Sequence, residues 1–144
     1  MVEAGSYCQE GGHSVRVLLI DDDPTVRDDL EFLLPATIRI VWAPGSEEAM
    51  EKIGQERHLD AIILDLCLPP HLSEREESEG LELLSALCEE LAPQVPVVVL
   101  SSVPRCEAEA ACLKRGASAY LEKPCSPGEL LRLLRGLTEH PSAQ

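Results

Sequence analysis

The sequence AIILDLCLPP, residues 61–70, decides the fold of this chain. Four apolar residues lead directly to Asp65, and Pro69 and Pro70 stop the apolar pattern shortly afterwards. A short apolar run bounded by turn residues is typical of a strand that is buried on both faces of a parallel sheet. Because an ionised carboxylate is rarely buried inside such a strand, we expect Asp65 at its carboxyl end, where open α/β sheets bind ligands. Taken alone, the stretch also fits an Asp that merely ends a strand.

Strand-like and helix-like patterns alternate along the rest of the chain. We expect strands over residues 15–20, 37–42, 60–65, 95–100 and 118–121. Apolar residues at helical spacing predict five helices, which begin near residues 24, 46, 80, 105 and 127. This alternation predicts an α/β fold, a doubly wound five-stranded parallel sheet with right-handed crossovers and five helices on its two faces. The expected strand order is 2-1-3-4-5, with strands one, three, four and five side by side.

Residues at the predicted helix ends support these boundaries. Asp23 followed by Pro24 predicts a helix N-cap with proline in the first turn. Ser126 and Glu129 have the spacing of a capping box at the start of the last helix. Gly116 suits the position after a helix end, where the backbone often becomes left-handed.

The length and the charge restrict the organisation and the function of the chain. Its 144 residues suit one domain, which we expect over residues 15–138, after a loose leader over 1–14 and before a short tail over 139–144. The 12 basic and 26 acidic residues give a net charge of −14. Such a surface repels phosphate, so we expect no direct binding of nucleic acid.

The hydropathy and the cysteines indicate the compartment. No apolar run is long enough to span a membrane, and no basic-then-apolar signal peptide opens the sequence, so we expect no membrane partner. The six cysteines include no CxxC pair, which disfavours zinc. Cys88 shares a helical face with leucines and is predicted to be a small core residue. Unpaired cysteines in an acidic domain of this size favour a reducing, cytoplasmic location.

Polar side chains follow four of the five predicted strands. Because the carboxyl ends of parallel strands meet at one edge of the sheet, these side chains are expected to converge on one crevice. In chain order they are Asp21 and Asp22, Asp65, Ser101 and Ser102, and Lys123. Each of them alone would be an ordinary turn or surface residue, but their joint occurrence favours a functional site.

The converging groups suit phosphoryl transfer to a carboxylate. Neighbouring carboxylates repel one another, and a hard cation such as Mg²⁺ (or Mn²⁺) relieves this conflict because it takes oxygen ligands and keeps several waters. A carboxylate can also act as a nucleophile and form an aspartyl phosphate. The ammonium group of Lys123 would then neutralise the transferring oxygens, and Ser101 could donate a hydrogen bond to them.

With these groups at its strand ends, the sequence resembles the receiver domain of response regulators in two-component signalling. The resemblance extends from Val15 to Thr138 and rests on four segments: Asp21-Asp22-Asp23-Pro24, Asp65 with Leu68-Pro69, Leu100-Ser101-Ser102, and Tyr120-Leu121-Glu122-Lys123-Pro124. It implies a flavodoxin-like fold, similar to that of chemotaxis regulators. It also implies a chain that is not an enzyme in the usual sense, since only its own phosphorylation and dephosphorylation are expected.

The resemblance implies a role for each residue at the acidic edge. Asp65 would accept phosphate from a histidine kinase or a phosphotransfer protein. Mg²⁺ (or Mn²⁺) would be held by the side chains of Asp22 and Asp65 and by the carbonyl group of Cys67, with Asp21 acting largely through water.

Further implied roles concern the phosphoryl group and its readout. Lys123, Ser101 and Ser102 would contact the phosphoryl group, and the peptide bond between Lys123 and Pro124 would be cis. Ser101 and Tyr120 would form a switch pair, in which Ser101 turns toward the phosphoryl group and Tyr120 moves inward. An output protein or a second copy would bind the face made of the helix over 105–115, the strand over 118–121 and the last helix.

The sequence departs from the family pattern beside the acceptor. Gly80 lies fifteen positions after Asp65 (80 minus 65), further than is usual, and the extra residues form an acidic loop over 70–79. Cys67 is an uncommon residue two positions after the acceptor. Cys125 occupies a position where an aromatic residue is usual.

Four other interpretations remain at this stage. The chain could be an aspartyl phosphatase similar to haloacid dehalogenases, but that family needs an Asp where this sequence has Cys67. It could bind flavin, but an acidic run after the first strand would repel the flavin phosphate. It could be a docking module that is never phosphorylated. It could also be the amino-terminal receiver of a longer regulator.

Overall fold

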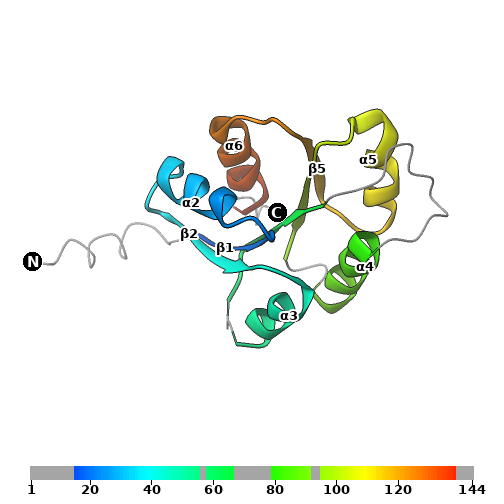
Figure 1. Cartoon of the computed structure of the whole chain (residues 1–144), viewed down its shortest axis with the longest axis horizontal. Helices are drawn as coiled ribbons and strands as arrows, with labels where there is room; N and C mark the ends of the chain where they lie inside the picture. The colour runs from blue at the N-terminus through cyan, green and yellow to red at the C-terminus, as the bar shows by residue number, and fades with distance from the viewer. Residues whose placement is uncertain (1–14, 56–57, 67–78, 92–94, 139–144) are drawn as a thin grey trace, which may run out of the picture.

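The sheet confirms the predicted architecture. The computed structural model describes residues 15–55, 58–66, 79–91 and 95–138. All strand pairs are parallel, and the strands lie in the order β2-β1-β3-β4-β5 (Figure 1). The strands are β1 (Val15–Ile20), β2 (Ile38–Ala43), β3 (Ala61–Asp65), β4 (Val97–Ser101) and β5 (Ala119–Glu122). The helices are α2 (Pro24–Leu33), α3 (Ser46–Gln55), α4 (Glu79–Leu91), α5 (Arg105–Lys114) and α6 (Pro127–Thr138).

The central strands are buried on both faces, as their apolar composition predicts. Every residue of β4 and the first four residues of β3 are buried. Along β1, Leu18 and Ile20 belong to one core cluster, whereas Val17 and Leu19 belong to the other. This alternation follows from strand geometry, in which successive side chains point to opposite faces of the sheet.

The helices form two layers, one on each face of the sheet. Helices α3, α4 and α5 cover one face, and α2 and α6 cover the other (Figure 1). In the first layer the buried helical side chains are Ala49, Leu81, Leu84, Leu87, Cys88, Ala108, Ala111 and Cys112. The predicted core position of Cys88 is therefore confirmed. In the second layer Leu130 and Leu134 of α6 are buried, while Val26 and Leu30 of α2 are only partly buried.

The predicted helix ends are present. The carboxylate of Asp23 accepts a hydrogen bond from the backbone N–H of Thr25 at 3.0 Å, and Pro24 lies in the first turn of α2. Ser126 and Glu129 form the reciprocal capping box, since each side chain accepts from the backbone N–H of the other, at 3.0 and 3.1 Å. Gly116 follows α5 with φ of +113°, a conformation that L-residues rarely adopt.

The strand limits differ from the prediction by one or two residues. The fourth strand begins at Val97 rather than at residue 95, because Pro96 has no N–H to donate to a ladder. The carbonyl oxygen of Pro96 does accept a hydrogen bond from Ile62 N at 2.9 Å. The predicted leader over 1–14, the tail over 139–144, Cys67 and residues 70–78 of the acidic loop lie outside the described residues.

The described helices also bear on the membrane prediction. None of them is both long enough and apolar enough to cross a bilayer.

Candidate functional site

The register of the sheet brings the predicted site residues to one edge. Ile20 pairs with Leu64 in the β1–β3 ladder, so the residues that follow them, Asp21 and Asp65, lie next to each other. Asp65 in turn pairs with Leu100 of β4. At the other end of the edge, Ser101 of β4 pairs with Glu122 of β5. The parallel topology thus gathers the carboxyl ends of β1, β3, β4 and β5, as the sequence predicts.

Asp21 is the most enclosed carboxylate of this edge. Its residue is 6% exposed, and its Oδ1 atom accepts a hydrogen bond from Asp23 N at 3.0 Å. Its Oδ2 atom is buried and has no hydrogen-bond partner. Burial above all, together with the neighbouring carboxylate of Asp65, raises the pKa of Asp21 from 3.8 to about 6. Without a divalent cation, burial therefore disfavours the ionised form of Asp21.

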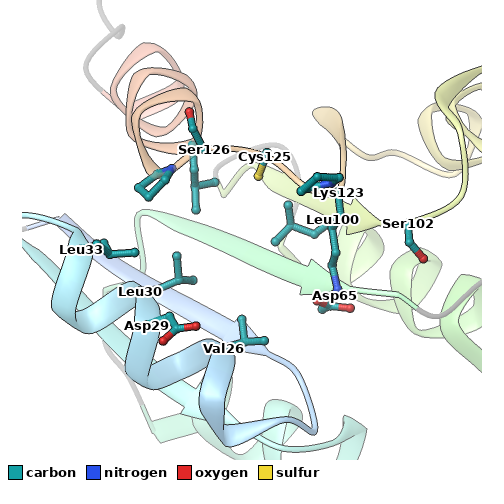
Figure 2. Close-up of a pocket in the computed structure, with 13 residues that line it drawn as sticks. Val26, Asp29, Leu30, Leu33, Asp65, Leu100, Ser102, Lys123, Cys125 and Ser126 are labelled. Carbon is teal, nitrogen blue, oxygen red and sulfur yellow. Dashed lines mark ion pairs between the residues drawn. The ribbon is translucent and has the colours of Figure 1, made fainter.

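Asp65 is paired with Lys123 across the sheet edge (Figure 2). Lys123 Nζ lies 2.5 Å from Asp65 Oδ2, and the Asp65 side chain is only 10% exposed. This contact is an ion pair in which the ammonium group of Lys123 meets a buried oxygen of Asp65. The backbone N–H of Lys123 donates to the carbonyl oxygen of Ser101 at 2.8 Å, which fixes the lysine relative to β4.

The donor set fits a hard cation. Asp21 presents a buried oxygen, Oδ2, without a hydrogen bond, and such an atom is costly unless a proton or a cation meets it. The buried Oδ2 atom of the neighbouring Asp65 already meets the ammonium group of Lys123. Within the described residues no three acidic, His or Cys side chains gather into a metal cluster. Mg²⁺ does not require one, because it keeps several waters and needs only one or two protein carboxylates.

Asp22 has a different environment from Asp21. Asp22 is exposed, whereas Asp21 is buried next to the acceptor carboxylate of Asp65. The Cys67 carbonyl, which the resemblance implies as a further ligand, lies outside the described residues. The division of metal-binding roles between Asp21 and Asp22 thus stays a prediction.

Ser101 and Tyr120 meet at one backbone residue. Ser101 is fully buried, and its hydroxyl accepts a hydrogen bond from Val103 N at 3.1 Å. The hydroxyl of Tyr120 donates to the carbonyl oxygen of Val103 at 2.6 Å. Burial raises the pKa of Tyr120 above its usual range. Tyr120 is only 3% exposed, so the expected inward movement does not start from this structure, in which the ring already fills the interior.

The remaining predicted residues lie around this centre. Ser102 is exposed and shares one groove wall with Asp65 and Lys123. The peptide bond between Lys123 and Pro124 is cis, the isomer that the sequence resemblance implies. The side chain of Lys123 reaches from the β5 end to the β3 end, as Figure 2 shows.

The sequence reasoning missed Trp42, which supports the acidic turn. Its indole Nε1 donates to the carbonyl oxygen of Asp21 at 2.8 Å. The guanidinium of Arg27 lies over the indole ring, 4.6 Å from its centroid. Trp42 stands one position before the end of β2, and a tryptophan at a strand end beside the site was the only available signal. The hydrogen bond connects β2 to the turn between β1 and α2.

Two elements of the predicted partner face, α5 and β5, are joined by hydrogen bonds. The side chain of Arg105, at the start of α5, donates to the carbonyl oxygen of Tyr120 in β5 at 3.1 Å. Its backbone N–H donates to the carboxylate of Glu122 at 3.0 Å. These bonds hold α5 against β5 on the side where Tyr120 is buried.

Comparison with known proteins places the sequence in a family. Residues 17–135 match the family described as "Response regulator receiver domain". The chain is 31% identical over 137 residues to "Two-component response regulator ORR1" of Oryza sativa subsp. japonica, which covers 86% of this chain and 56% of that relative. It is 34% identical over 125 residues to "Response regulator MprA" of Mycobacterium ulcerans, which covers 86% and 50%. The chain thus spans about half the length of these curated relatives.

Solved structures agree with this match. The receiver domain of the Francisella response regulator 1452 is 27% identical, with a TM-score of 0.72, and the match covers 87% of this chain and 97% of that one. A CheY-like receiver domain from Methanospirillum hungatei JF-1 is 25% identical, with a TM-score of 0.71 and coverage of 87% and 94%.

Proposed function

Because the chain belongs to the response regulator receiver family, we propose that it is a phosphoryl-accepting switch in which Asp65 takes phosphate from a histidine kinase or a phosphotransfer protein. The observation that carries this proposal is the pairing of Asp65 with Lys123 next to the buried carboxylate of Asp21. A nucleophilic carboxylate, a neighbouring ammonium group and a second carboxylate with an unpartnered oxygen are parts that the transfer needs.

The chain's own residues have separate parts in the transfer. A carboxylate oxygen of Asp65 attacks phosphorus, the bond from phosphorus to the donor atom breaks, and the electron pair leaves with the donor. Lys123, which neutralises Asp65 in the resting chain, can shift its contact to the incoming phosphoryl oxygens because its side chain remains 36% exposed. Mg²⁺ (or Mn²⁺), held by Asp65, Asp21 and Asp22, would supply the remaining positive charge.

The switch would start from the hydrogen bonds at Val103. Ser101 can bind a phosphoryl oxygen only by giving up its bond to Val103 N, which lies in the loop before α5. That change would disturb the Val103 carbonyl that holds Tyr120. We propose that the face made of α5, β5 and α6 then changes its affinity for an output protein or a second copy. Ser101→Ala should still be phosphorylated but should lose this response.

The direct test is phosphorylation from a small donor. Incubation with acetyl phosphate and Mg²⁺ should add one phosphoryl group by intact mass, labile in base, and omission of the metal should prevent the addition. Asp65→Asn should abolish it, since an amide is not a nucleophile, whereas Asp29→Asn is a matched control on α2 that should retain it. Unchanged phosphorylation of Asp65→Asn would refute the acceptor assignment. Failure of the wild type with every donor would favour a docking module that is never phosphorylated.

The free cysteines bear on the cellular location of the chain. A phosphorylation switch with free cysteines, of which Cys88, Cys106, Cys112 and Cys125 are described, suits the cytoplasm.

A further inference from the structure

The side chain of Trp42 connects three elements beside the acidic edge. Its strand β2 lies at one edge of the sheet, and Trp42 pairs with Leu19 in the β1–β2 ladder. The indole Nε1–H donates to the carbonyl oxygen of Asp21, in the turn between β1 and α2, at 2.8 Å. From α2, the guanidinium of Arg27 lies over the ring, 4.6 Å from its centroid, and a cation and an aromatic face attract each other in this arrangement. The indole is thus held between β2, the turn and α2.

The bond from Trp42 is one of three that fix Asp21. The backbone N–H of Asp21 donates to the carbonyl oxygen of Ala43 at 3.0 Å, and its Oδ1 atom accepts from Asp23 N at 3.0 Å. The peptide groups before and after Asp21 are therefore both bonded to β2, the first through its N–H and the second through its carbonyl oxygen. Because φ and ψ relate the two peptide planes that flank a residue, these bonds restrict the direction in which the Asp21 side chain leaves the backbone.

The carboxylate held in this way has one oxygen left. Asp21 is 6% exposed, and its buried Oδ2 atom has no hydrogen-bond partner among the described residues. The register of β1 and β3 puts Asp21 next to Asp65, the acceptor of the proposed function. A turn that is already fixed presents this oxygen in one position, so a cation that binds there does not have to order the turn first.

We propose that Trp42 is a positioning residue for the cation site, and that its bond to the Asp21 carbonyl holds the β1–α2 turn so that Asp21 Oδ2 is preorganised for Mg²⁺ (or Mn²⁺). This inference rests on the proposed function, since the cation is the one that the phosphoryl transfer would use. It adds that Trp42 sets the affinity for the cation and leaves the reactivity of Asp65 unchanged once the cation is bound.

The packing of Trp42 needs a matched control. Trp42 is partly buried against the core cluster that α2 and α6 cover, and loss of such packing lowers stability whatever the cation does. Ile40 lies two positions earlier on the same face of β2, is also partly buried and packs against the same cluster. Its aliphatic side chain has no donor. Ile40→Ala therefore reports the effect of lost packing alone.

The first experiment measures cation affinity directly. Trp42→Phe keeps an aromatic ring but loses the N–H donor. Calorimetric titration with Mg²⁺ at pH 8 should give a Kd roughly tenfold higher than that of the wild type, as is typical when a group that orients a metal ligand is removed. Ile40→Ala should destabilise the chain and leave this Kd unchanged. An unchanged Kd in Trp42→Phe, an equal rise in Ile40→Ala, or a wild type that binds no Mg²⁺ would overturn the proposal.

A second variant removes the donor without changing the shape of the side chain. Trp42 is the only tryptophan in the sequence, so an analogue incorporated in place of tryptophan changes this side chain alone. Benzothienylalanine has a sulfur atom where tryptophan has its N–H, whereas fluorotryptophan retains the N–H. The first analogue should weaken Mg²⁺ binding about as much as Trp42→Phe does, and the second should retain wild-type affinity. Wild-type affinity with benzothienylalanine would refute the positioning role, even if Trp42→Phe did not fold.

A kinetic measurement keeps the two proposals distinguishable. The rate of Asp65 phosphorylation by acetyl phosphate is followed by intact mass as Mg²⁺ is varied. Trp42→Phe should raise the Mg²⁺ concentration at half-maximal rate by the same factor as the Kd and leave the maximal rate unchanged, whereas a lower maximal rate at an unchanged midpoint would contradict the positioning role.

The two measurements together separate the possible failures. If no donor phosphorylates the wild type but the Trp42 variants bind Mg²⁺ more weakly, the proposed function fails and the positioning role stands. If the wild type is phosphorylated and all variants bind Mg²⁺ equally well, the positioning role fails alone.

Discussion

The two helical layers of this molecule differ in how completely they cover the sheet. Helix α4 buries Leu81, Leu84 and Leu87 completely, whereas α2 has no buried residue among its ten. Both helices are amphipathic and both lie on the same sheet. The difference indicates that α4, in the closed layer of α3, α4 and α5, contributes more to stability than α2 does. In the open layer of α2 and α6, α6 buries Leu130 and Leu134, but α2 leaves apolar surface accessible beside the acidic edge. Substitutions in the two layers should therefore have effects of different size.

The largest expected effect is in the closed layer. Leu84→Ala removes a side chain with no exposure and should lower the free energy of unfolding by about 2–5 kcal/mol, because it leaves a cavity. Leu33→Ala in the open layer should change it by about 0.5 kcal/mol or less. Urea denaturation of both variants measures the contrast. Similar losses for the two leucines would mean that the layers are equally important for stability.

The second effect is a pH dependence of stability that arises from Asp21, at the carboxyl edge of the sheet. The folded chain holds the Asp21 proton more tightly than an exposed Asp does, since its pKa is about 6 instead of 3.8. Without a divalent cation, the contribution of Asp21 to the free energy of unfolding should be greatest below pH 3.8. It should be lost as the pH rises through about 6. Asp21→Asn should remove this fall and add up to about 3 kcal/mol at pH 8.

The measurement for Asp21 is denaturation in EDTA at pH 5 and pH 8. Asp22→Asn is the matched control, because Asp22 is the adjacent and exposed residue, and it should change neither value. A pH dependence that persists in Asp21→Asn would assign it to another group.

A smaller effect is expected where α4 and α5 meet. A Cβ atom at Gly116 would lie 2.8 Å from Cys88 Cβ, and the backbone there has φ of +113°. Gly116→Ala should therefore cost about 1–3 kcal/mol. Gly136→Ala in α6 is the control, since nothing lies within 4 Å of its Cβ position, and it should not destabilise the chain. Thermal unfolding of both variants would show whether the closed layer is as tightly fitted as its burial indicates.

The smallest effect is expected in the open layer, at the start of α6. Ser126→Ala removes one half of the capping box and should cost about 1 kcal/mol. Amide hydrogen exchange should rise in the first turn of α6 and leave α4 unchanged. Faster exchange in α4 as well would show that the two layers open together.

The sequence predicted most of the fold because the strands are unambiguous. VVVL in β4 and AIIL in β3 are too short and too apolar for surface helices, and Asp23, Ser126 and Gly116 mark helix ends by local chemistry. The start of β4 was placed too early because Pro96 continues the apolar pattern but cannot donate to the ladder.

The site was only partly predictable for a related reason. Strand ends indicate which residues converge, so Asp21, Asp65 and Lys123 were found. Burial of an individual side chain depends on packing across the sheet, which spacing does not reveal. The enclosed position of Asp21 relative to Asp22, the inward ring of Tyr120 and the groove beside Asp65 therefore required the structure.

The hydrogen bond between Trp42 and Asp21 gives the chain its own optical probe. Trp42 is the only tryptophan in the sequence, and its indole N–H is bonded to the carbonyl of the residue whose side chain enters the candidate cation site. The fluorescence of an indole depends on such a bond and on nearby charge. Emission from the unlabelled protein should change when Mg²⁺ neutralises the acidic turn, so occupancy of the site can be followed in real time without a dye.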